Sequence, residues 1–140
     1  MKLVLAFDRD GTIDSSPDPG PIPLAWLPKL AEVAHVYAIG NPLLGPEAGI
    51  PDHHEIKRRA KTLKYRVIEP DWSVWTVVPE DQRDNIAGKF RRLSRLSAIH
   101  PNMLRLSIDD YPLYRMPGWT YWTPSGFFRQ GLDHWLRFAK

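Results

Sequence analysis

The sequence contains no cysteine, and this absence excludes several kinds of chemistry. Disulfide bonds, thiolate zinc sites, iron–sulfur clusters and cysteine nucleophiles are all impossible. There is also no hydrophobic run near the ~20 residues that a membrane-spanning helix needs. The apolar stretch that follows Met1 and Lys2 is too short for a signal peptide and runs directly into acidic residues. We therefore expect a soluble, cytoplasmic protein.

What the chain does contain is typical of one globular domain. It has 140 residues, of which 43% are hydrophobic and 25% are charged. This length suits a single domain over residues 1–140 with one proper core. The net charge of +3 permits an acidic partner without requiring one. Fourteen prolines predict short, sharply bounded elements.

Short apolar runs alternate with helical patterns along the chain. Such alternation indicates an α/β domain with a largely parallel sheet. The expected strands are residues 2–7, 36–39, 104–108 and 119–122, and residues 65–68 and 74–78 are predicted as two further strands or a small hairpin. The expected helices are residues 24–34, kinked or starting late because of Pro28, residues 52–63 with Asp52 as N-cap, residues 80–99, and a C-terminal helix capped by Ser125.

Acidic residues follow two of these expected strands. Asp8 and Asp10 come after the first strand, and Asp109 and Asp110 come after the strand at 104–108. In open α/β sheets, ligands bind beyond the carboxyl ends of the strands. If the two strands are neighbours, these carboxylates converge, and a cation is needed to offset their repulsion. Oxygen ligands without cysteine favour Mg²⁺.

The same residues carry a resemblance to a known family. The stretch from Leu3 to Thr12, an apolar strand followed by Asp-Arg-Asp-Gly-Thr, resembles the first motif of the haloacid dehalogenase-like superfamily. Ile108-Asp109-Asp110 resembles the fourth motif, an acidic pair after a later strand. The resemblance implies a three-layer α/β/α sandwich with a mostly parallel, Rossmann-like sheet. It also implies phosphatase activity.

The resemblance assigns roles to matching positions. Asp8 would be the nucleophile that forms an aspartyl-phosphate, and Asp10 would be the general acid and base. Gly11 would let the chain turn tightly behind the acids, and Thr12 would stabilise that turn beside the substrate. The metal ligands would be Asp8, the Asp10 carbonyl, Asp109 and Asp110, holding Mg²⁺. The acid/base at position 10 belongs to the phosphatase pattern rather than to dehalogenase chemistry.

Two further motifs of the family fit less closely. The second motif ends a strand with Ser or Thr, whereas this chain has Gly40 there, followed by Asn41. Backbone amides at these positions, or the Asn41 side chain, would have to bind the phosphoryl oxygens instead. A missing donor of this kind can cost ~10²–10³ in rate. The third motif is a cation before the acidic pair. Lys89 is the candidate, and its rivals are Arg83, Arg91 and Lys57.

Little sequence is left over for a cap domain. Residues 10–40 and 40–89 each have room only for core elements and loops, so we expect a capless member. An open site would admit a phosphate on a small molecule or on a macromolecule. Basic stretches at residues 57–64 and 89–95 are compatible with nucleic acid but are also typical of a solvated helix face. The tryptophans and tyrosines between residues 72 and 122 are of the type that stacks on bases, although packing in the core and loops is the more usual role.

Two other functions remain as alternatives. The first is a catalytically weak or inactive binding module on the same fold, for protein or nucleic acid, and Gly40 is its main support. The second is a phospho-accepting receiver domain, which is disfavoured because no acceptor Asp follows the expected strands at 65–68 or 74–78. The leading hypothesis is a Mg²⁺-dependent phosphohydrolase.

Overall fold

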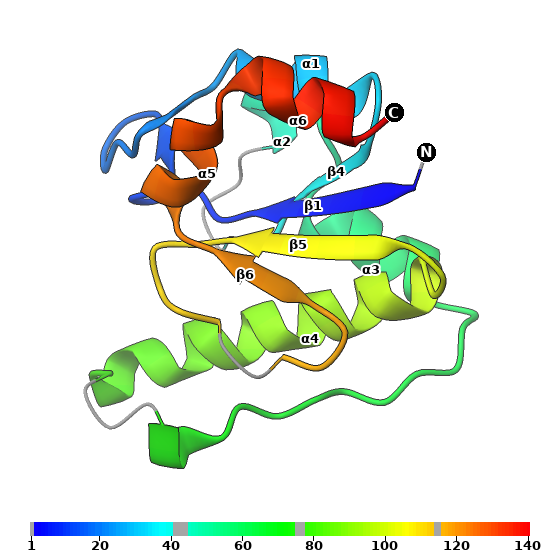
Figure 1. Ribbon diagram of the computed structural model, residues 1–140. Coiled ribbons are helices and arrows are strands. Elements are labelled where there is room, and N and C mark those ends of the chain that lie inside the picture. Colours follow the sequence, from blue (N-terminus) through cyan, green and yellow to red (C-terminus); the bar gives the residue numbers. More distant parts are fainter. Residues whose placement is uncertain (1, 41–44, 75–77, 114–115) are drawn as a thin grey trace.

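The core of the protein is a parallel sheet of four strands. The computed structural model describes residues 2–40, 45–74, 78–113 and 116–140. The strands are β1 (Leu3–Phe7), β4 (His35–Ala38), β5 (Leu104–Ile108) and β6 (Thr120–Trp122), and their order across the sheet is β4-β1-β5-β6 (Figure 1). A second, two-stranded sheet joins β2 (Ile13–Asp14) to β3 (Ile22–Pro23). The expected α/β class and the four strands of the main sheet are therefore confirmed.

Helices cover both faces of the main sheet (Figure 1). One face carries α1 (Trp26–Ala31), α5 (Pro124–Gln130) and α6 (Leu132–Phe138), and the other carries α3 (His53–Ala60) and α4 (Arg83–Ile99). Short elements complete the chain: the helix α2 (Gly45–Ala48) and two 3₁₀ turns, η1 (Trp72–Val74) and η2 (Glu80–Gln82).

The central strand β1 explains why both faces need cover. All five of its residues are buried, which is typical of a strand inside a parallel sheet. Successive side chains point to opposite faces. Leu3, Leu5 and Phe7 therefore join the core beneath α1, α5 and α6, while Val4 and Ala6 join the core beneath α3 and α4.

The helix expected at residues 24–34 was predicted either to be kinked or to start late, and it starts late. Its N-cap is Ala25, so Pro28 falls in the first turn. The first backbone N–H groups of a helix have no partner four residues earlier, and proline at this point costs no hydrogen bond. Leu27 and Leu30 face the core.

The predicted strands at 65–68 and 74–78 are wrong for the described residues of these segments. Residues 64–71 form an irregular segment that follows α3, and Trp72–Val74 is a 3₁₀ turn. The Ile68 N–H donates to Ser94 Oγ on α4 at 3.0 Å instead of to a neighbouring strand. The β-prone side chains of Ile68, Trp72 and Val78 pack against the core at α4, so burial without strand pairing accounts for the apolar pattern.

The C-terminal helix also differs from its prediction. Its N-cap is Thr123, whose side chain accepts a hydrogen bond from Gly126 N–H at 3.0 Å, and not Ser125. Pro124 then occupies the first helical position, where proline is favoured. Gly131, at φ +87°, divides the expected single helix into α5 and α6. Glycine alone adopts this backbone conformation readily.

The strand order creates a crevice at one edge of the sheet. From β1 the chain goes to β4 on one side, and it then crosses to β5 on the other side. The carboxyl ends of β1 and β5 therefore lie where the direction of winding reverses, which is where open α/β sheets bind ligands. Separately, among the residues that the structure describes, no helix is long and apolar enough to cross a membrane.

Candidate active site

Asp8 and Asp109 lie side by side because their strands are paired. Phe7 is in register with Ile108, and the Asp8 N–H donates to the Ile108 carbonyl at 3.0 Å, so the ladder continues one residue past β1. Both side chains are nearly inaccessible, with residue exposures of 4% for Asp8 and 0% for Asp109. The expected meeting of acids from two neighbouring strands is confirmed.

Three contacts hold Asp109 in place. Its Oδ1 accepts a hydrogen bond from the Tyr111 N–H at 2.9 Å, and its backbone carbonyl accepts one from Tyr121 Oη at 2.8 Å. Its own N–H donates to the Trp122 carbonyl at 3.4 Å. The edge strand β6 therefore supports the backbone of Asp109, although Tyr121 carries no sequence signal for that role.

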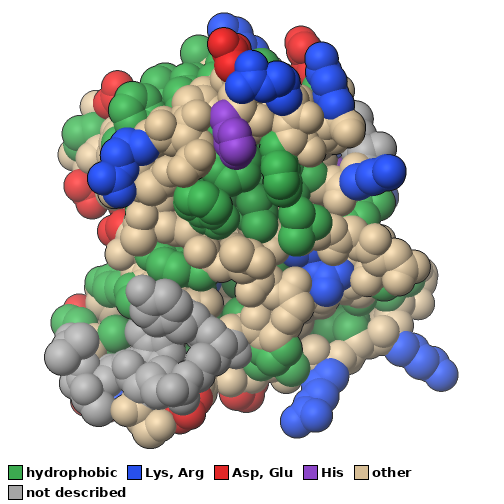
Figure 2. All heavy atoms as spheres, in the orientation of Figure 1, with side chains coloured by type: hydrophobic (Ala, Val, Ile, Leu, Met, Phe, Trp, Pro, Cys, Tyr) green, Lys and Arg blue, Asp and Glu red, His purple; other side chains and the backbone are tan. Residues whose placement is uncertain are grey.

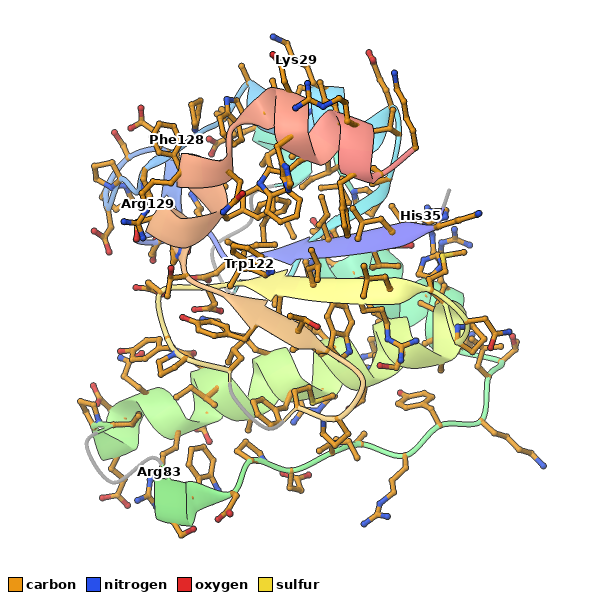
Figure 3. All side chains as sticks on the ribbon, viewed as in Figure 1. Lys29, His35, Arg83, Trp122, Phe128 and Arg129 are labelled. Carbon is orange, nitrogen blue, oxygen red and sulfur yellow. The ribbon has the colours of Figure 1, made fainter. Side chains whose placement is uncertain are left out.

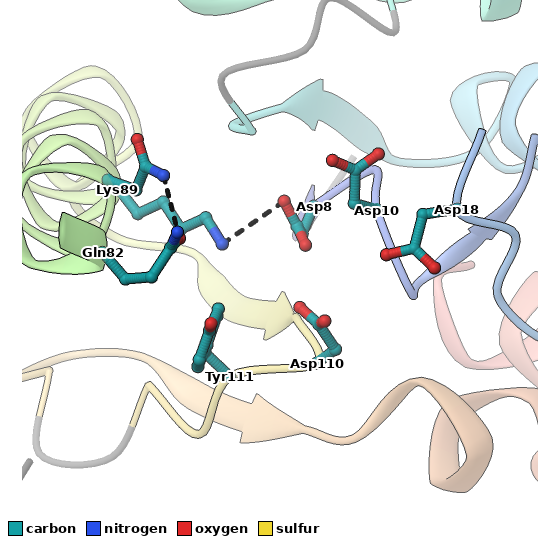
Figure 4. A pocket seen from close by; sticks show the side chains of 8 residues that line it. Asp8, Asp10, Asp18, Gln82, Lys89, Asp110 and Tyr111 are labelled. Carbon is teal, nitrogen blue, oxygen red and sulfur yellow. Dashed lines mark hydrogen bonds and ion pairs between the residues drawn. The ribbon is translucent and has the colours of Figure 1, made fainter. Parts of the chain in front are cut away.

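Lys89 links the two buried acids. Its Nζ lies 3.3 Å from Asp8 Oδ1 (Figure 4). The same Nζ lies 2.9 Å from Asp109 Oδ2 and hydrogen-bonds Asp109 Oδ1 at 3.1 Å. The lysine itself is only 5% exposed. The sequence argument selected Lys89 from several cations, and the structure places this residue at the acidic pair.

Its three rivals lie elsewhere. The Arg83 guanidinium stacks over the Trp72 ring at 5.2 Å, Arg91 is exposed on α4, and Lys57 lines a separate groove beside α3. None of the three lines the cavity that contains Asp8.

The charges at this site are only partly balanced. Burial raises the pKa of Asp8 to about 6, with Lys89 opposing the rise and Asp110 adding to it. Burial also raises the pKa of Asp109 well above its usual range, and the neighbouring Asp8 contributes further. Burial alone would lower the pKa of Lys89, but Asp109 and Asp8 outweigh it and raise that pKa. One lysine therefore does not fully compensate the carboxylates, which leaves room for a further cation.

Three carboxylates are close enough to share such a cation. Oxygens of Asp8, Asp109 and Asp110 all lie within 4.8 Å of one another. Asp109 Oδ2 is buried and accepts no hydrogen bond from the described residues, although it is ion-paired with Lys89. An all-oxygen set of this kind fits a hard divalent cation such as Mg²⁺. The Asp10 carboxylate is not part of this group, and coordination by the Asp10 backbone carbonyl stays a prediction.

Two glycines allow the chain to approach the acids closely. Gly11 has φ +71°, and a Cβ there would lie 2.6 Å from Asp110 Oδ2. The predicted tight turn behind the acids is therefore present. Gly40 is buried at the end of β4, and a Cβ there would lie 2.7 Å from Asp8 Oδ1. Gly40 thus lies directly against Asp8. Asn41 lies outside the described residues.

Thr12 is positioned differently from a substrate-contacting residue. It is fully buried, and it does not line the cavity. Its backbone N–H donates to the Arg9 carbonyl and its own carbonyl accepts from the Ile22 N–H, so the residue does hold the loop together. Its hydroxyl has no hydrogen-bond partner among the described residues.

A cavity of about 200 Å³ opens beside Asp8 (Figure 4). Asp10 and Asp18 line it on the side of Asp8 away from Lys89. The full set of lining residues is Asp8, Asp10, Asp18, Gln82, Asn85, Lys89, Asp110 and Tyr111. The cavity therefore combines several carboxylates with one amine, two carboxamides and an aromatic ring.

The sequence argument did not assign Asp18, Gln82 or Asn85 to the site. Asp18 comes from a proline-rich loop without regular spacing, so nothing in the sequence indicated it. A signal did exist for the other two residues. Gln82, Asn85 and Lys89 recur at helical spacing. This places Gln82, the N-cap of α4, on the same side as Asn85 and Lys89 of that helix. Asn85 Nδ2 donates to Gln82 Oε1 at 3.0 Å, so the two amides form a pair.

No protein-family model, curated protein or solved structure matches the chain. What the site can do chemically therefore rests on its own residues. A buried carboxylate beside a lysine and two further carboxylates can act as a nucleophile towards phosphorus when a cation screens its charge. A second carboxylate on the cavity wall, Asp10, can exchange protons with a bound ligand.

Proposed function

We propose that this chain is a Mg²⁺-dependent phosphohydrolase with a three-layer, capless, haloacid dehalogenase-like fold. The observation that carries the proposal is the convergence of Asp8, Lys89, Asp109 and Asp110 at the point where the sheet reverses its winding. The motif after β1 and the acidic pair after β5 supply the order of residues that this chemistry needs.

The reaction follows from the positions of two carboxylates. An Asp8 oxygen attacks phosphorus and forms an acyl-phosphate bond, while the bond between phosphorus and the ester oxygen breaks. Asp10 gives its proton to that leaving oxygen. A water then transfers a proton to Asp10 and attacks phosphorus, and the bond to Asp8 breaks to release phosphate.

Lys89 and the remaining acids prepare Asp8 for this attack. The lysine lowers the cost of keeping Asp8 ionised, and it also lies beside the position of the incoming phosphate. Asp8, Asp109 and Asp110, with the Asp10 carbonyl, would hold Mg²⁺. When bound, this ion offsets the repulsion between Asp8 and the phosphate dianion.

A matched pair of variants tests the proposal. Hydrolysis of p-nitrophenyl phosphate should require Mg²⁺, stop on addition of a chelator and return when Mg²⁺ is restored. Asp8→Asn should abolish turnover because the amide is a poor nucleophile. Asp14→Asn removes an exposed carboxylate from the short strand β2 and should retain turnover. Unchanged hydrolysis by folded Asp8→Asn would exclude the mechanism.

Gly40 supports a second function, that of a binding module without catalysis. Position 40 has no hydroxyl for the phosphoryl group, and its backbone crowds Asp8. This alternative predicts no turnover on any phosphate ester together with retained binding of a partner. Against it, the buried Asp8–Lys89–Asp109 arrangement is costly to fold, and a purely structural surface has no need of it.

A further inference from the structure

Many cations of the protein line two grooves outside its acidic site. A groove of about 440 Å³ between α3 and α4 is lined by Lys57, Arg58, Lys61 and Arg95. An adjoining groove of about 470 Å³ is lined by Lys64, Arg66 and Arg105. No carboxylate lines either groove among the described residues. The net charge of +3 therefore conceals a strong separation of positive from negative charge.

Few carboxylates neutralise these cations. Glu55 pairs with Arg58 and Arg59 on α3. Among the described residues, no ion pair involves Lys57, Lys61 or Arg95. Both lysines are exposed. In Figure 2, Lys and Arg side chains project along the lower right border of the molecule, where Figure 1 shows the chain between α3 and α4.

An aromatic ring lies between the two grooves. Tyr65 lines both of them and is 37% exposed. Its Oη accepts a hydrogen bond from Arg95 Nε at 3.0 Å, which limits the movement of the ring. An exposed ring with cations on either side suits a base stacked between backbone phosphates, and it does not suit a carboxylate-rich peptide, which offers no flat partner for the ring.

A series of contacts links the groove between α3 and α4 to Asp8. His54 lines this groove, and its ring centroid lies 4.3 Å from that of the preceding His53. The His53 side chain also makes a hydrogen bond with the backbone of Gly40. Gly40 in turn lies against Asp8. On α4, Asn85 lines the cavity beside Asp8 and Arg95 lines the groove. At a helical rise of 1.5 Å per residue, these two residues are about 15 Å apart along the helix axis.

We infer that the two basic grooves bind the phosphate backbone of a single-stranded nucleic acid, with Tyr65 as the stacking platform. Because His54, His53 and Gly40 connect this surface to Asp8, the terminal phosphate of such a strand is the substrate class assigned to the site. This second statement rests on the proposed phosphohydrolase function, whereas binding of the strand does not.

A matched pair of double variants tests the binding. Lys57→Gln with Lys61→Gln removes two groove cations, and Lys29→Gln with Arg129→Gln removes two exposed cations from α1 and α5 on the opposite face (Figure 3). Fluorescence polarisation of labelled oligothymidylate should show affinity lower by about tenfold for the first pair. For the groove variant, the slope of log affinity against log salt concentration should be shallower by about 1.4, because two cations are removed. The second pair should bind like the wild type.

A third variant separates stacking from charge. Tyr65→Ser should weaken binding of oligothymidylate by about tenfold while the salt dependence stays at its wild-type value, because no cation is removed. If the groove variant and the control variant bind oligothymidylate with equal affinity, the inference is overturned. The inference is also overturned if the wild type does not bind oligothymidylate. Displacement of the oligonucleotide by an acidic phosphopeptide of higher affinity would also overturn it.

Activity measurements on two phosphate esters distinguish failure of this inference from failure of the proposed function. With a 5′-phosphorylated oligothymidylate, the groove variant should raise KM about tenfold and leave turnover of p-nitrophenyl phosphate unchanged. If the wild type hydrolyses neither ester, the proposed function fails, and the binding measurements still decide whether the grooves take nucleic acid. If the aryl ester is hydrolysed but the groove variant affects neither binding nor KM, the inference fails alone.

Discussion

At the scale of single residues, Lys89 does more for the site than any other side chain outside the acids. It is the only cation that lines the cavity among the described residues, and it contacts both Asp8 and Asp109. Removing one member of a buried ionic group leaves an uncompensated charge. The folded protein then has two ways to recover: it can protonate a carboxylate, or it can bind a cation.

The first prediction concerns Lys89→Met. Without divalent cations, the free energy of unfolding should fall by about 3 kcal/mol, because Asp8 and Asp109 lose their partner. Mg²⁺ should restore part of that loss by occupying the carboxylate cluster. Urea unfolding with and without Mg²⁺ measures both effects, with the exposed Lys29→Met as control. A Lys89→Met protein that Mg²⁺ does not stabilise against urea would contradict the metal site.

The second prediction concerns Gly40→Ala. The new Cβ would lie 2.7 Å from Asp8 Oδ1, so the carboxylate must move away from its position beside Lys89. Displacing a reacting group by about 1 Å can cost ~10² in rate, and we expect a loss of that order in turnover.

Gly88→Ala is the matched control. A Cβ at position 88 meets its nearest atom, on Arg92, at an ordinary 3.5 Å. Because alanine is favoured over glycine inside a helix, this variant should gain up to about 1 kcal/mol in stability and keep its activity. If Gly40→Ala were as active as Gly88→Ala, close approach of residue 40 would not matter for Asp8.

At the scale of elements, the ends of strands and helices determine which residues reach the site. Asp109 was predictable because it follows an apolar strand, and its register against β1 then brings it beside Asp8. Lys89 was predictable from its order before the acidic pair. Asp18 and Tyr121 were not predictable, because each acts through contacts made only after the loop and the edge strand have packed.

The third prediction tests the corrected helix start after β6. Thr123→Ala should cost about 1 kcal/mol of stability, because it removes the cap that accepts from the Gly126 N–H. Ser125→Ala, which would carry that cost if the sequence-based assignment had been right, should change stability by less than about half as much. Thermal unfolding of the two variants decides between the two caps.

At the scale of the whole molecule, the carboxylates, the cations and a pair of histidines lie in three separate regions. The carboxylates meet at the carboxyl edge of the sheet, and the cations line the grooves beside α3 and α4. A third group contains His100, which hydrogen-bonds Tyr37 Oη through Nε2 at 2.8 Å. Its ring lies 4.3 Å from that of His35.

The fourth prediction concerns acid stability. Burial, followed by the charges of His35, Arg59 and Arg105, lowers the pKa of His100 to about 4. In the unfolded chain the value is about 6.5, so neutral His100 contributes stability above that pH and loses it as the pH falls towards 4. The shift corresponds to at most about 3 kcal/mol. Stability of His100→Gln should fall less steeply over that window, with exposed His54→Gln as control. Equal slopes for His100→Gln and the wild type would contradict this assignment.

The overall α/β class was predictable because alternating strands and helices have distinct periods in sequence. The segment between α3 and α4 was not predictable in the same way. Its β-prone residues Ile68 and Val78 are partly buried against the core at α4 and are not part of a sheet. A single sequence does not distinguish an apolar residue buried in a loop from one buried in a strand. That segment also carries Tyr65, and with it the proposed nucleic-acid surface.

A crystal structure of the protein with Mg²⁺ and beryllofluoride, which mimics a phosphoryl group bound to aspartate, tests the central claim most directly. The account predicts beryllium bonded to a carboxylate oxygen of Asp8, with Lys89 beside the fluorides and Mg²⁺ among Asp8, Asp109 and Asp110. Beryllofluoride bonded to any other residue, with Asp8 still paired only with Lys89, would contradict it.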